Sequence, residues 1–490
     1  MNEQRVSVGP ALPAAVIFLI VGAVVGIAYQ QWLWAGLLVF PPLLYLGIYH
    51  PRMLFYLAVL TAPFTVEYPL PGIGIALALP TEPLLIILAA LFFLHLLHVK
   101  KYPTEVLRHP LTMLIIAYLG WMLITTVTST MPLVSAKHWG KHFIYVVVLY
   151  FYGILLYRRW QAVKSFIILY ATGLTAVSLY TLWVEWQGFF SHETAYFASA
   201  PFYSDHTIYG AILGLMLPLI LGLAFFPRRF ALRKWEWGLI AAAAGVNMVS
   251  LVLSYARAAW LSMIGVLAFI PFLTLRIRLR WILLLIIGLV AGIIMNWESI
   301  YVFMATNRAA SSGDFRRHIQ SIYNIATDPS NMERINRWSC ALRMAEDKPL
   351  FGFGPATFPF QYGPYQLSYQ RTIISTDWGD IGGAHHEYLG ALAEMGIVGM
   401  LLFTALVLTS IYIGMHAFYD RRRPVRLRWA AGLILIGLMT YYIHGFINNF
   451  LDTDELPFLF WALLGMLTAV DLEGRKPTSA ESDNAVDNRR

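Results

Sequence analysis

Four stretches of the sequence place cationic or titratable side chains at the edges of long apolar runs or in the longest loop between them. They are "FYSDHTIYGAILGLMLPLI" (202–220, with Asp205 and His206), "LSYARAAWLSMIG" (253–265, with Arg257), "ERINRWSCALRMAEDKPLFGFGP" (333–355, with Arg334 and Arg337) and "GGAHHEYLGALAEMGIVGM" (382–400, with His385, His386 and Glu387). Arginine binds phosphate through parallel hydrogen bonds and stays charged at any working pH. A neutral histidine can accept a proton from a sugar hydroxyl, because its ordinary pKa lies near physiological pH. Together, on one face of a membrane, these groups suit transfer chemistry on a phosphate-bearing lipid.

Each of these signals also has an ordinary structural explanation. An arginine near a helix end, such as Arg257, usually extends to the lipid headgroups. Other ordinary roles are a solvated helix face for Arg337 and Arg343, a helix cap for His206 and His386, and a favourable place in the helix dipole for Glu387. Adjacent histidines on a helix point apart, and no third histidine or cysteine accompanies them, so we expect no metal site.

The composition predicts a membrane protein. Of the 490 residues, 58% are hydrophobic and only 13% are charged, with a mean hydropathy of +0.62. A soluble domain carries about 25% charged residues. The net charge of +8 need not indicate nucleic acid, because lysine and arginine collect in the cytoplasmic loops of membrane proteins. The single cysteine, Cys340, excludes an internal disulfide.

Apolar runs of about 20 residues predict an all-α, polytopic chain with about 12–14 spans. The runs cover residues 11–29, 32–48, 53–66, 82–98, 111–127, 141–157, 164–183, 207–226, 236–255, 257–275, 279–297, 388–415, 428–448 and 455–471. Basic stretches at 50–52, 100–108, 158–164, 227–234, 276–280 and 420–428 then fall on one side. The positive-inside rule makes that side cytoplasmic. Both termini would therefore be cytoplasmic, and the four reactive stretches would lie outside.

These spans divide the chain into four parts. They are an N-terminal transmembrane bundle (1–297), an extracytoplasmic loop (298–387), C-terminal transmembrane spans (388–471) and a polar tail expected to be disordered (472–490). Connections longer than about 12–15 residues are usually functional or disordered. This loop holds an amphipathic stretch (331–347) that predicts a surface helix, followed by a segment rich in Gly, Pro and aromatic residues (349–370). We expect an ordered, partly helical lid whose aromatic residues stack on sugar rings.

In order and spacing, these segments resemble the O-antigen ligase and O-antigen polymerase superfamily. The similarity is most specific over 334–400, where "RINRW", "ALRMAEDKPLFGFGPATF" and "AHHEYLGALAEMGIVGM" resemble the family's Arg–x3–Trp, "DxPLxGxGPxxF" and "AHNxYLxxLxExGxxG" segments. Further similar segments, ending with "INNFLDTDELPFLFWALLGM" (447–466), extend the likeness over roughly 200–470. The family usually has Asn after its histidine, where this chain has His386. We map the family histidine onto His385; a register shift of one residue would make His386 the catalytic residue.

The resemblance implies a multi-span C-type glycosyltransferase (GT-C) fold in the bacterial inner membrane, with its active site facing the periplasm. The implied donor is a glycan on undecaprenyl diphosphate. Ligases transfer it to lipid A–core, and polymerases transfer it to another lipid-linked glycan. The reaction is expected to invert the anomeric centre and to need no metal or cofactor. Membrane lipids are the other expected partners, and nucleic acid is not one.

The resemblance also assigns residue roles. His385 would be the general base for the acceptor hydroxyl, and Arg257 and Arg334 would bind the diphosphate and stabilise it as the leaving group. Further residues that could contact the substrate or acceptor, or support the catalytic groups, are Asp205, His206, Arg337, His386, Glu387 and Asp452.

Other functions remain open at this point. We favour a ligase, with a polymerase of the same superfamily as the alternative. From another class, a lipid-linked glycan flippase or transporter predicts charged residues at mid-membrane. The clearest candidates, Glu82 and Glu185, lie near the ends of predicted spans. A purely structural scaffold would leave the loop motifs unexplained.

Overall fold

The computed structural model describes residues 32–70, 75–99, 101–296, 329–376 and 382–475, together with Val21. The chain divides into two compact units, Met1–Tyr102 and Pro103–Arg490. The predicted first span (11–29) lies outside the described residues, apart from Val21. So does the predicted tail beyond Arg475.

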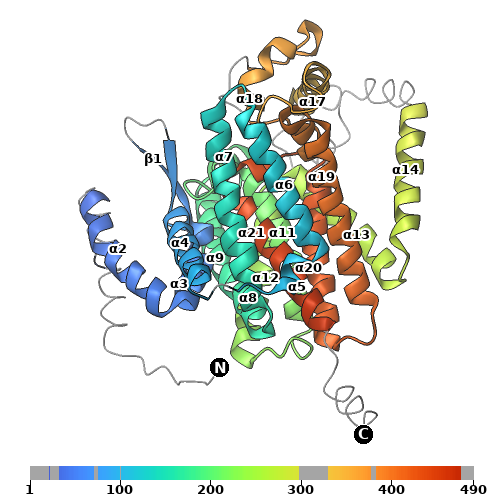
Figure 1. Cartoon of the computed structure of the whole chain (residues 1–490). Helices are drawn as coiled ribbons and strands as arrows, with labels where there is room; N and C mark the ends of the chain where they lie inside the picture. Colours follow the sequence, from blue (N-terminus) through green and yellow to red (C-terminus); the bar gives the residue numbers. More distant parts are fainter. Residues whose placement is uncertain are drawn as a thin grey trace. The chain divides into compact units, whose positions relative to one another are not determined.

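The first unit combines apolar helices with one β-hairpin (Figure 1). Its helices are α2 (Trp32–Tyr49), α3 (Pro51–Thr61) and α4 (Thr81–Val99), and its strands are β1 (Val66–Leu70) and β2 (Ile75–Leu79). The strands pair antiparallel, with Val66 opposite Leu79. The predicted third span (53–66) is therefore wrong in its last residues, because α3 ends at Thr61 and a short 3-10 turn leads into β1. Pro63 lies in that turn and cannot donate the backbone hydrogen bond that a continuing helix needs.

The second unit is a helical bundle. Its helices are α5 (Thr104–Leu107), α6 (Pro110–Val127), α7 (Pro132–Tyr145), α8 (Gly153–Tyr157), α9 (Trp160–Gln187), α10 (His192–Phe197), α11 (His206–Phe225), α12 (Lys234–Leu253), α13 (Arg257–Thr274), α14 (Leu279–Met295), α17 (Pro329–Asp347), α18 (Phe358–Gln361), α19 (Glu387–Tyr419), α20 (Val425–His444) and α21 (Glu455–Gly474). Among the described residues of the whole chain, nine helices are long and apolar enough to cross a membrane. The all-α polytopic class is confirmed.

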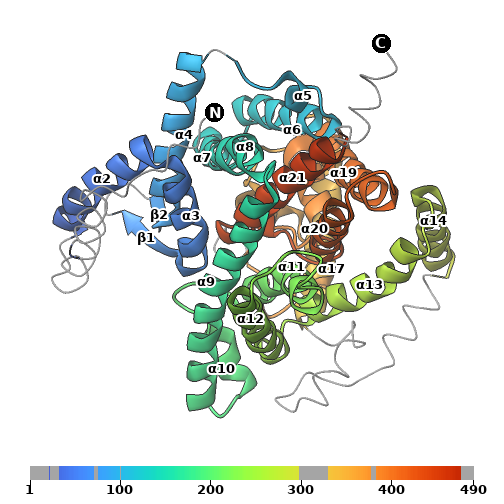
Figure 2. The ribbon, with the colours of Figure 1, turned by 90° about the horizontal axis from the view of Figure 1, so that it is seen from below.

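The bundle is built around α11 and α21, which are buried along nearly their whole length (Figures 1 and 2). α11 packs against α12, α13 and α20, and α21 packs against α8, α19 and α20. Both sequences are apolar on every side, which is what a helix surrounded by other helices requires.

One helix is longer than the sequence suggested. We predicted a loop over 128–140, but α7 begins at Pro132 and continues through wide helical turns (146–152) into α8. His138 of the predicted loop is buried inside the bundle, and so is His142, which lies in the predicted span 141–157. Polarity therefore marked an interior contact here rather than exposure to water.

Three bundle helices carry the predicted reactive stretches at one end and an arginine-rich loop at the other. α11 runs from His206 to the loop at 226–233, α13 runs from Arg257 to the loop at 275–278, and α19 runs from Glu387 to the loop at 420–424. α17 packs against α19 near its first residues. The reactive side chains are thus one helix length away from the arginine-rich loops.

Candidate functional site

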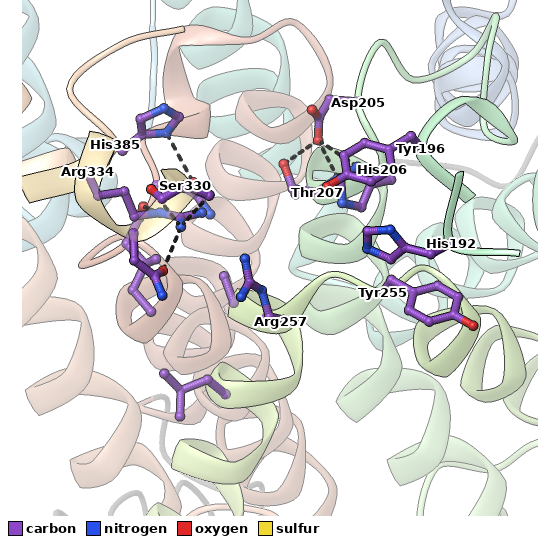
Figure 3. A pocket seen from close by; sticks show the side chains of 15 residues that line it. His192, Tyr196, Asp205, His206, Thr207, Tyr255, Arg257, Ser330, Arg334 and His385 are labelled. Carbon is purple, nitrogen blue, oxygen red and sulfur yellow. Dashed lines mark hydrogen bonds and ion pairs between the residues drawn. The ribbon is translucent and has the colours of Figure 1, made fainter. Parts of the chain in front are cut away.

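A cavity of about 290 Å³ lies at the first ends of α11 and α13 and beside the turn that precedes α19 (Figure 3). Five of the residues singled out in the sequence line it: Asp205, His206, Arg257, Arg334 and His385. On one side the lining comes from α17 and from the turns before α19 and after α20. On the other side it comes from α10, α11 and the turn between α12 and α13.

Arg257 reaches the cavity because the turn before α13 packs very closely against α11. A side chain on Gly210 of α11 would bring its Cβ within 2.4 Å of the Ala256 Cβ, so only glycine allows this approach. Tyr255 within the turn has a left-handed backbone, with φ 52°. An arginine at a helix start is unfavourable beside the positive end of the helix dipole. Arg257 therefore gains nothing from the dipole of α13, and its place in the cavity wall is compatible with an anionic ligand.

Arg334 and Trp338 lie one turn apart on α17: Arg334 lines the cavity, and Trp338 supports His385, which also lines it. The Arg334 Nε donates to the Ile447 carbonyl (3.3 Å), and its Nη1 donates to Ser330 Oγ (3.0 Å), which holds the guanidinium at the cavity wall. The Trp338 Nε1 donates to the carbonyl oxygen of His385 (3.1 Å). The Arg–x3–Trp spacing thus puts the guanidinium of Arg334 and the indole of Trp338, which supports His385, on one face of the helix.

The two adjacent histidines have different environments. His385 has a left-handed backbone, with φ 51°, and lines the cavity. His386 caps α19 instead: its Nδ1 accepts the backbone N–H of Leu389 (3.2 Å), and its ring packs against Trp338 and Phe446. His386 is not among the cavity residues. The geometry favours His385, not His386, as the residue that meets a substrate.

Two asparagines that the sequence analysis did not single out hold His385. The backbone N–H of His385 donates to Asn449 Oδ1 (2.8 Å), and its Nδ1 lies 3.3 Å from Asn448 Oδ1. The Asn448 amide nitrogen faces His444 Nε2 at 3.0 Å, so the amide oxygen faces His385. His385 then carries its proton on Nδ1, which leaves a lone pair on Nε2. Asn448 and Asn449 belong to the segment 447–466, which resembles the family, but nothing in the spacing of that segment indicated a contact with His385.

The His385 ring is held neutral. Burial, followed by the charges of Arg334 and Arg337, lowers its pKa to about 3, against the hydrogen bond to Asn448, which raises it. Burial lowers the pKa of His386 to about 4. At neutral pH both rings can therefore accept a proton, although His385 is a weak base beside the charges of Arg334 and Arg337.

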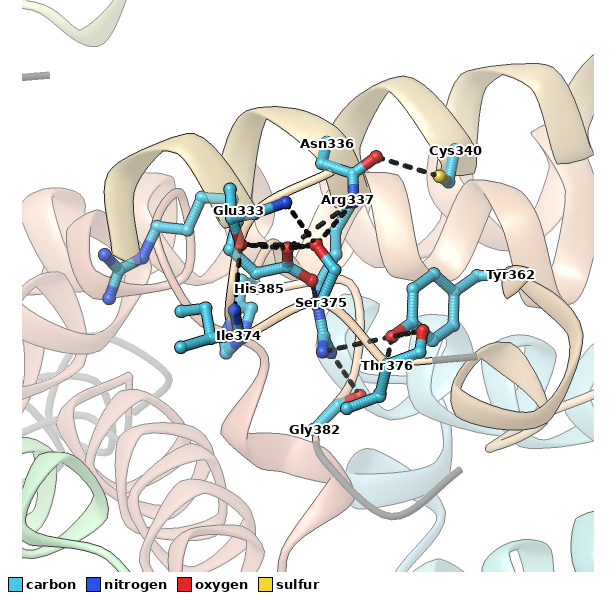
Figure 4. A network of polar contacts seen from close by, with 12 residues as sticks. Glu333, Asn336, Arg337, Cys340, Tyr362, Ile374, Ser375, Thr376, Gly382 and His385 are labelled. Atoms are coloured by element: carbon cyan, nitrogen blue, oxygen red, sulfur yellow. Dashed lines mark hydrogen bonds and ion pairs between the residues drawn. The ribbon is translucent and has the colours of Figure 1, made fainter. Parts of the chain in front are cut away.

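Arg337 is not on a solvated face of α17, as the ordinary explanation supposed. Its side chain is 1% exposed and paired with Glu333 (2.8 Å). It donates to the carbonyls of Gly382 (2.6 Å) and Gly383 (2.9 Å) in the turn before His385 (Figure 4). Arg337 thus shapes the turn that carries His385 and does not line the cavity.

Glu387 and Asp452 also lie away from the main cavity. With His138, His142 and Glu394 they line a separate pocket of about 20 Å³. Glu387 accepts the Tyr441 hydroxyl and the Leu451 backbone N–H (2.9 Å), and Asp452 accepts the amide nitrogen of Asn449. Burial raises the pKa of Asp452 to about 6. Both carboxyl groups fix the turn after α20, which presents Asn448 and Asn449 to His385.

The glycine-rich segment that follows α17 is an anchor on α19. Gly354 N–H donates to the Glu394 carbonyl (2.8 Å), and the Glu394 carboxylate accepts the backbone N–H groups of Ala356 (3.0 Å) and Phe358 (2.9 Å). α19 is interrupted at Gly396, with φ 67°, where a Cβ would lie 2.0 Å from the Leu350 oxygen. The segment's buried aromatics form a small core: Phe353, Phe358 and Tyr362. These three rings are therefore not available to stack on sugars, as we had expected of the loop.

Comparison with known proteins agrees with this geometry. Residues 242–404 match the family described as O-antigen ligase, and this range contains Arg257, Arg334 and His385. Among curated proteins none matches the chain. The resemblance to the O-antigen ligase and polymerase superfamily is confirmed over the matched residues. The match supports a membrane glycan enzyme of the O-antigen ligase or polymerase type.

Proposed function

We propose that this protein is a metal-independent, inverting glycosyltransferase of the O-antigen ligase type. It would transfer a glycan from undecaprenyl diphosphate to lipid A–core at the periplasmic face of the bacterial inner membrane. One observation carries the proposal: His385, Arg257 and Arg334 border a single cavity at helix ends remote from the arginine-rich loops. The positive-inside rule makes the arginine-rich loops cytoplasmic, which supports a periplasmic cavity.

In this proposal Arg257 and Arg334 bind the diphosphate. Their guanidinium groups come from two helices, and the first turns of α11 and α13 add the positive ends of their dipoles. As the bond between the anomeric carbon and the diphosphate oxygen breaks, negative charge grows on that oxygen. Donors already fixed around this position stabilise the charge without reorganising at the moment of reaction.

His385 acts on the acceptor in the same step. Its Nε2 takes the proton of the acceptor hydroxyl while the hydroxyl oxygen attacks the anomeric carbon from the face opposite the diphosphate. The hydroxyl oxygen gains the bond to carbon, and the diphosphate leaves with the electron pair of the broken bond. Asn448 accepts from Nδ1–H throughout and steadies the imidazolium that forms.

Donor binding would also strengthen the base. The charges of Arg334 and Arg337 contribute to the low pKa of His385. A bound diphosphate compensates the cavity charge, so the pKa of His385 should rise when the donor is present. The base would then become effective only in the loaded enzyme.

The decisive experiment is glycan transfer by the purified protein in detergent, with lipid-linked glycan as donor and lipid A–core as acceptor. Wild type should form the new glycosidic bond, His385→Ala should not, and His386→Ala is the matched control that keeps activity. A transporter forms no glycosidic bond, whether or not a gradient is present. If donor chains lengthen and lipid A–core stays unmodified, the protein is a polymerase. If neither product forms, the proposal is wrong.

A further inference from the structure

The cavity has a second side that the proposed chemistry does not use. Four rings line this side and contact one another in three pairs: His192 with Tyr196 (centroids 4.9 Å apart), His192 with Tyr255 (5.1 Å) and Tyr196 with His206 (4.2 Å). These four residues are called the aromatic side below. Figure 3 shows them with Asp205 on one side of Arg257, and Arg334 and His385 on the other. The lining therefore changes from cationic to aromatic across Arg257.

The aromatic side is fixed by the protein before any ligand arrives. His192 and Tyr196 lie four residues apart on α10, and therefore on one face of it. The Tyr255 hydroxyl donates to the Phe190 carbonyl (3.2 Å), which ties the turn before α13 to the segment before α10. α10 itself is capped by Ser191, whose hydroxyl accepts the Thr194 N–H (3.2 Å).

His206 keeps hydrogen-bonding capacity that the protein does not use. Its side chain is only 8% exposed, and among the described residues its Nδ1 finds no hydrogen-bond partner. The nearest carboxylate oxygen, Asp205 Oδ1 at 3.5 Å, accepts instead from the backbone N–H and the hydroxyl of Thr207. A buried polar group without a partner is unfavourable and rare, so such a group in a cavity wall points to a ligand.

We propose that the aromatic side binds a pyranose ring of the glycan substrate. This inference rests on the proposed function and adds the sugar-binding part of the same cavity. Aromatic faces pack against the C–H face of a sugar, while imidazole and carboxylate groups bond its hydroxyls. A second phosphate would be repelled by Asp205, and a lipid chain would leave the buried His206 Nδ1 without a hydrogen bond.

The charges on this side suit a neutral ligand. Burial and the nearby Arg257 charge lower the pKa of His192, so its ring is neutral at pH 7 and offers one donor and one acceptor. Arg257 lies between the two sides, where the sugar joins the diphosphate in the donor or where an acceptor sugar approaches it. A cavity of about 290 Å³ is at the lower end of the size range of small-molecule sites, which is about 300–1,000 Å³.

The test compares two probes: the glycan-bearing carrier extracted from cells that make it, and sugar-free undecaprenyl diphosphate. Each of two variants removes one contact of the aromatic side and leaves the helices of the bundle packed as they are. Tyr196→Ala truncates a residue that is 43% exposed, and His206→Phe keeps a ring against Tyr196 but loses the nitrogens. Phe197→Ala is the matched control, because Phe197 lies on the same helix, is 77% exposed and does not line the cavity.

Both variants should bind the glycan-bearing carrier about tenfold more weakly than wild type, which is the usual effect of losing one buried hydrogen bond or ring contact. Their affinity for sugar-free undecaprenyl diphosphate should not change. If donor binding is unchanged and the KM for lipid A–core rises about tenfold instead, the ring belongs to the acceptor and the subsite stands. If the variants match Phe197→Ala in both assays, or weaken both probes equally, the subsite is refuted. A wild type that binds neither probe refutes the proposed function itself.

Discussion

Replacing Asn448 by aspartate tests whether His385 is the base, because it changes the charge beside the ring and little else. The Asn448 amide oxygen lies 3.3 Å from His385 Nδ1, and a carboxylate of the same shape would put a negative charge there. His444, which now faces the amide nitrogen, can adapt by carrying its proton on Nε2, since its Nδ1 makes no hydrogen bond among the described residues. Asn448→Asp should therefore fold.

The size of the effect follows from the distance. Two unit charges 3.3 Å apart attract by about 5 kcal/mol at an effective dielectric constant of about 20, and a close carboxylate commonly shifts a neighbouring pKa by about 1–3 units. The change raises the pKa of His385 from about 3 towards 4–6. A base is inactive when protonated, so a raised pKa removes activity as the pH falls through the new value. At pH 8 the variant should be at least as active as wild type.

The assay is kcat/KM for glycan transfer between pH 4.5 and 8.5, because that ratio reports the pKa values of the free enzyme. Wild type should show no loss of activity from protonation of His385 in this range, whereas Asn448→Asp should lose activity as the pH falls through the raised pKa of about 4–6. Asn448→Ala is the control: it should lower activity at every pH, without raising the pH below which activity is lost. Identical acid limbs in wild type and Asn448→Asp would show that His385 does not titrate in the reaction.

Other predictions concern the cations, the helix cap and the anchor. Arg257→Lys and Arg334→Lys keep a positive charge but lose the paired hydrogen bonds of a guanidinium. Each should therefore lower kcat/KM by about tenfold to a hundredfold in steady-state transfer assays. Wild-type rates in both variants would contradict the diphosphate site. His386→Ala should keep transfer and cost about 1 kcal/mol of stability through the lost cap of α19, seen as a lower melting temperature; lost transfer in a stable protein would reassign the base. Glu394→Gln weakens two contacts to the 349–358 segment and should cost about 1–3 kcal/mol, seen as faster proteolysis there; unchanged cleavage would contradict the anchor.

Apolar length and charge asymmetry predicted most of the helices. The expected surface helix over 331–347 is the larger part of α17, and the apolar run at 388–415 is the centre of α19. The failures have a common physical cause. Residues 128–140 were expected to form a loop because no long apolar run covers them, yet His138 there and the nearby His142 face a buried pocket that also holds Glu387 and Asp452. A single sequence shows which residues are polar but not which of them meet partners inside the bundle.

The site was only partly predictable for a related reason. Arg257 could be found because arginine is uncommon at apolar helix ends outside the predicted cytoplasmic loops, and Arg334 because it begins the "RINRW" segment of the long loop. Asn448 and Asn449 could not be found, because their contacts with His385 cross more than 60 residues of chain and asparagine has many other uses. Arg337 was misjudged because its role depends on the carbonyl groups of Gly382 and Gly383, which no residue pattern reveals.

The different roles of the two adjacent histidines follow from one backbone torsion. A left-handed conformation at a residue other than glycine costs about 1–3 kcal/mol and persists only when the surroundings fix it. At His385 both neighbouring groups are held: Asn449 accepts the N–H and Trp338 donates to the carbonyl. The turn then directs the His385 ring into the cavity while His386 begins α19 as its cap. The strain at His385 is thus maintained by α17 and by the turn after α20, so the loop and the last spans are needed to hold the proposed base in position.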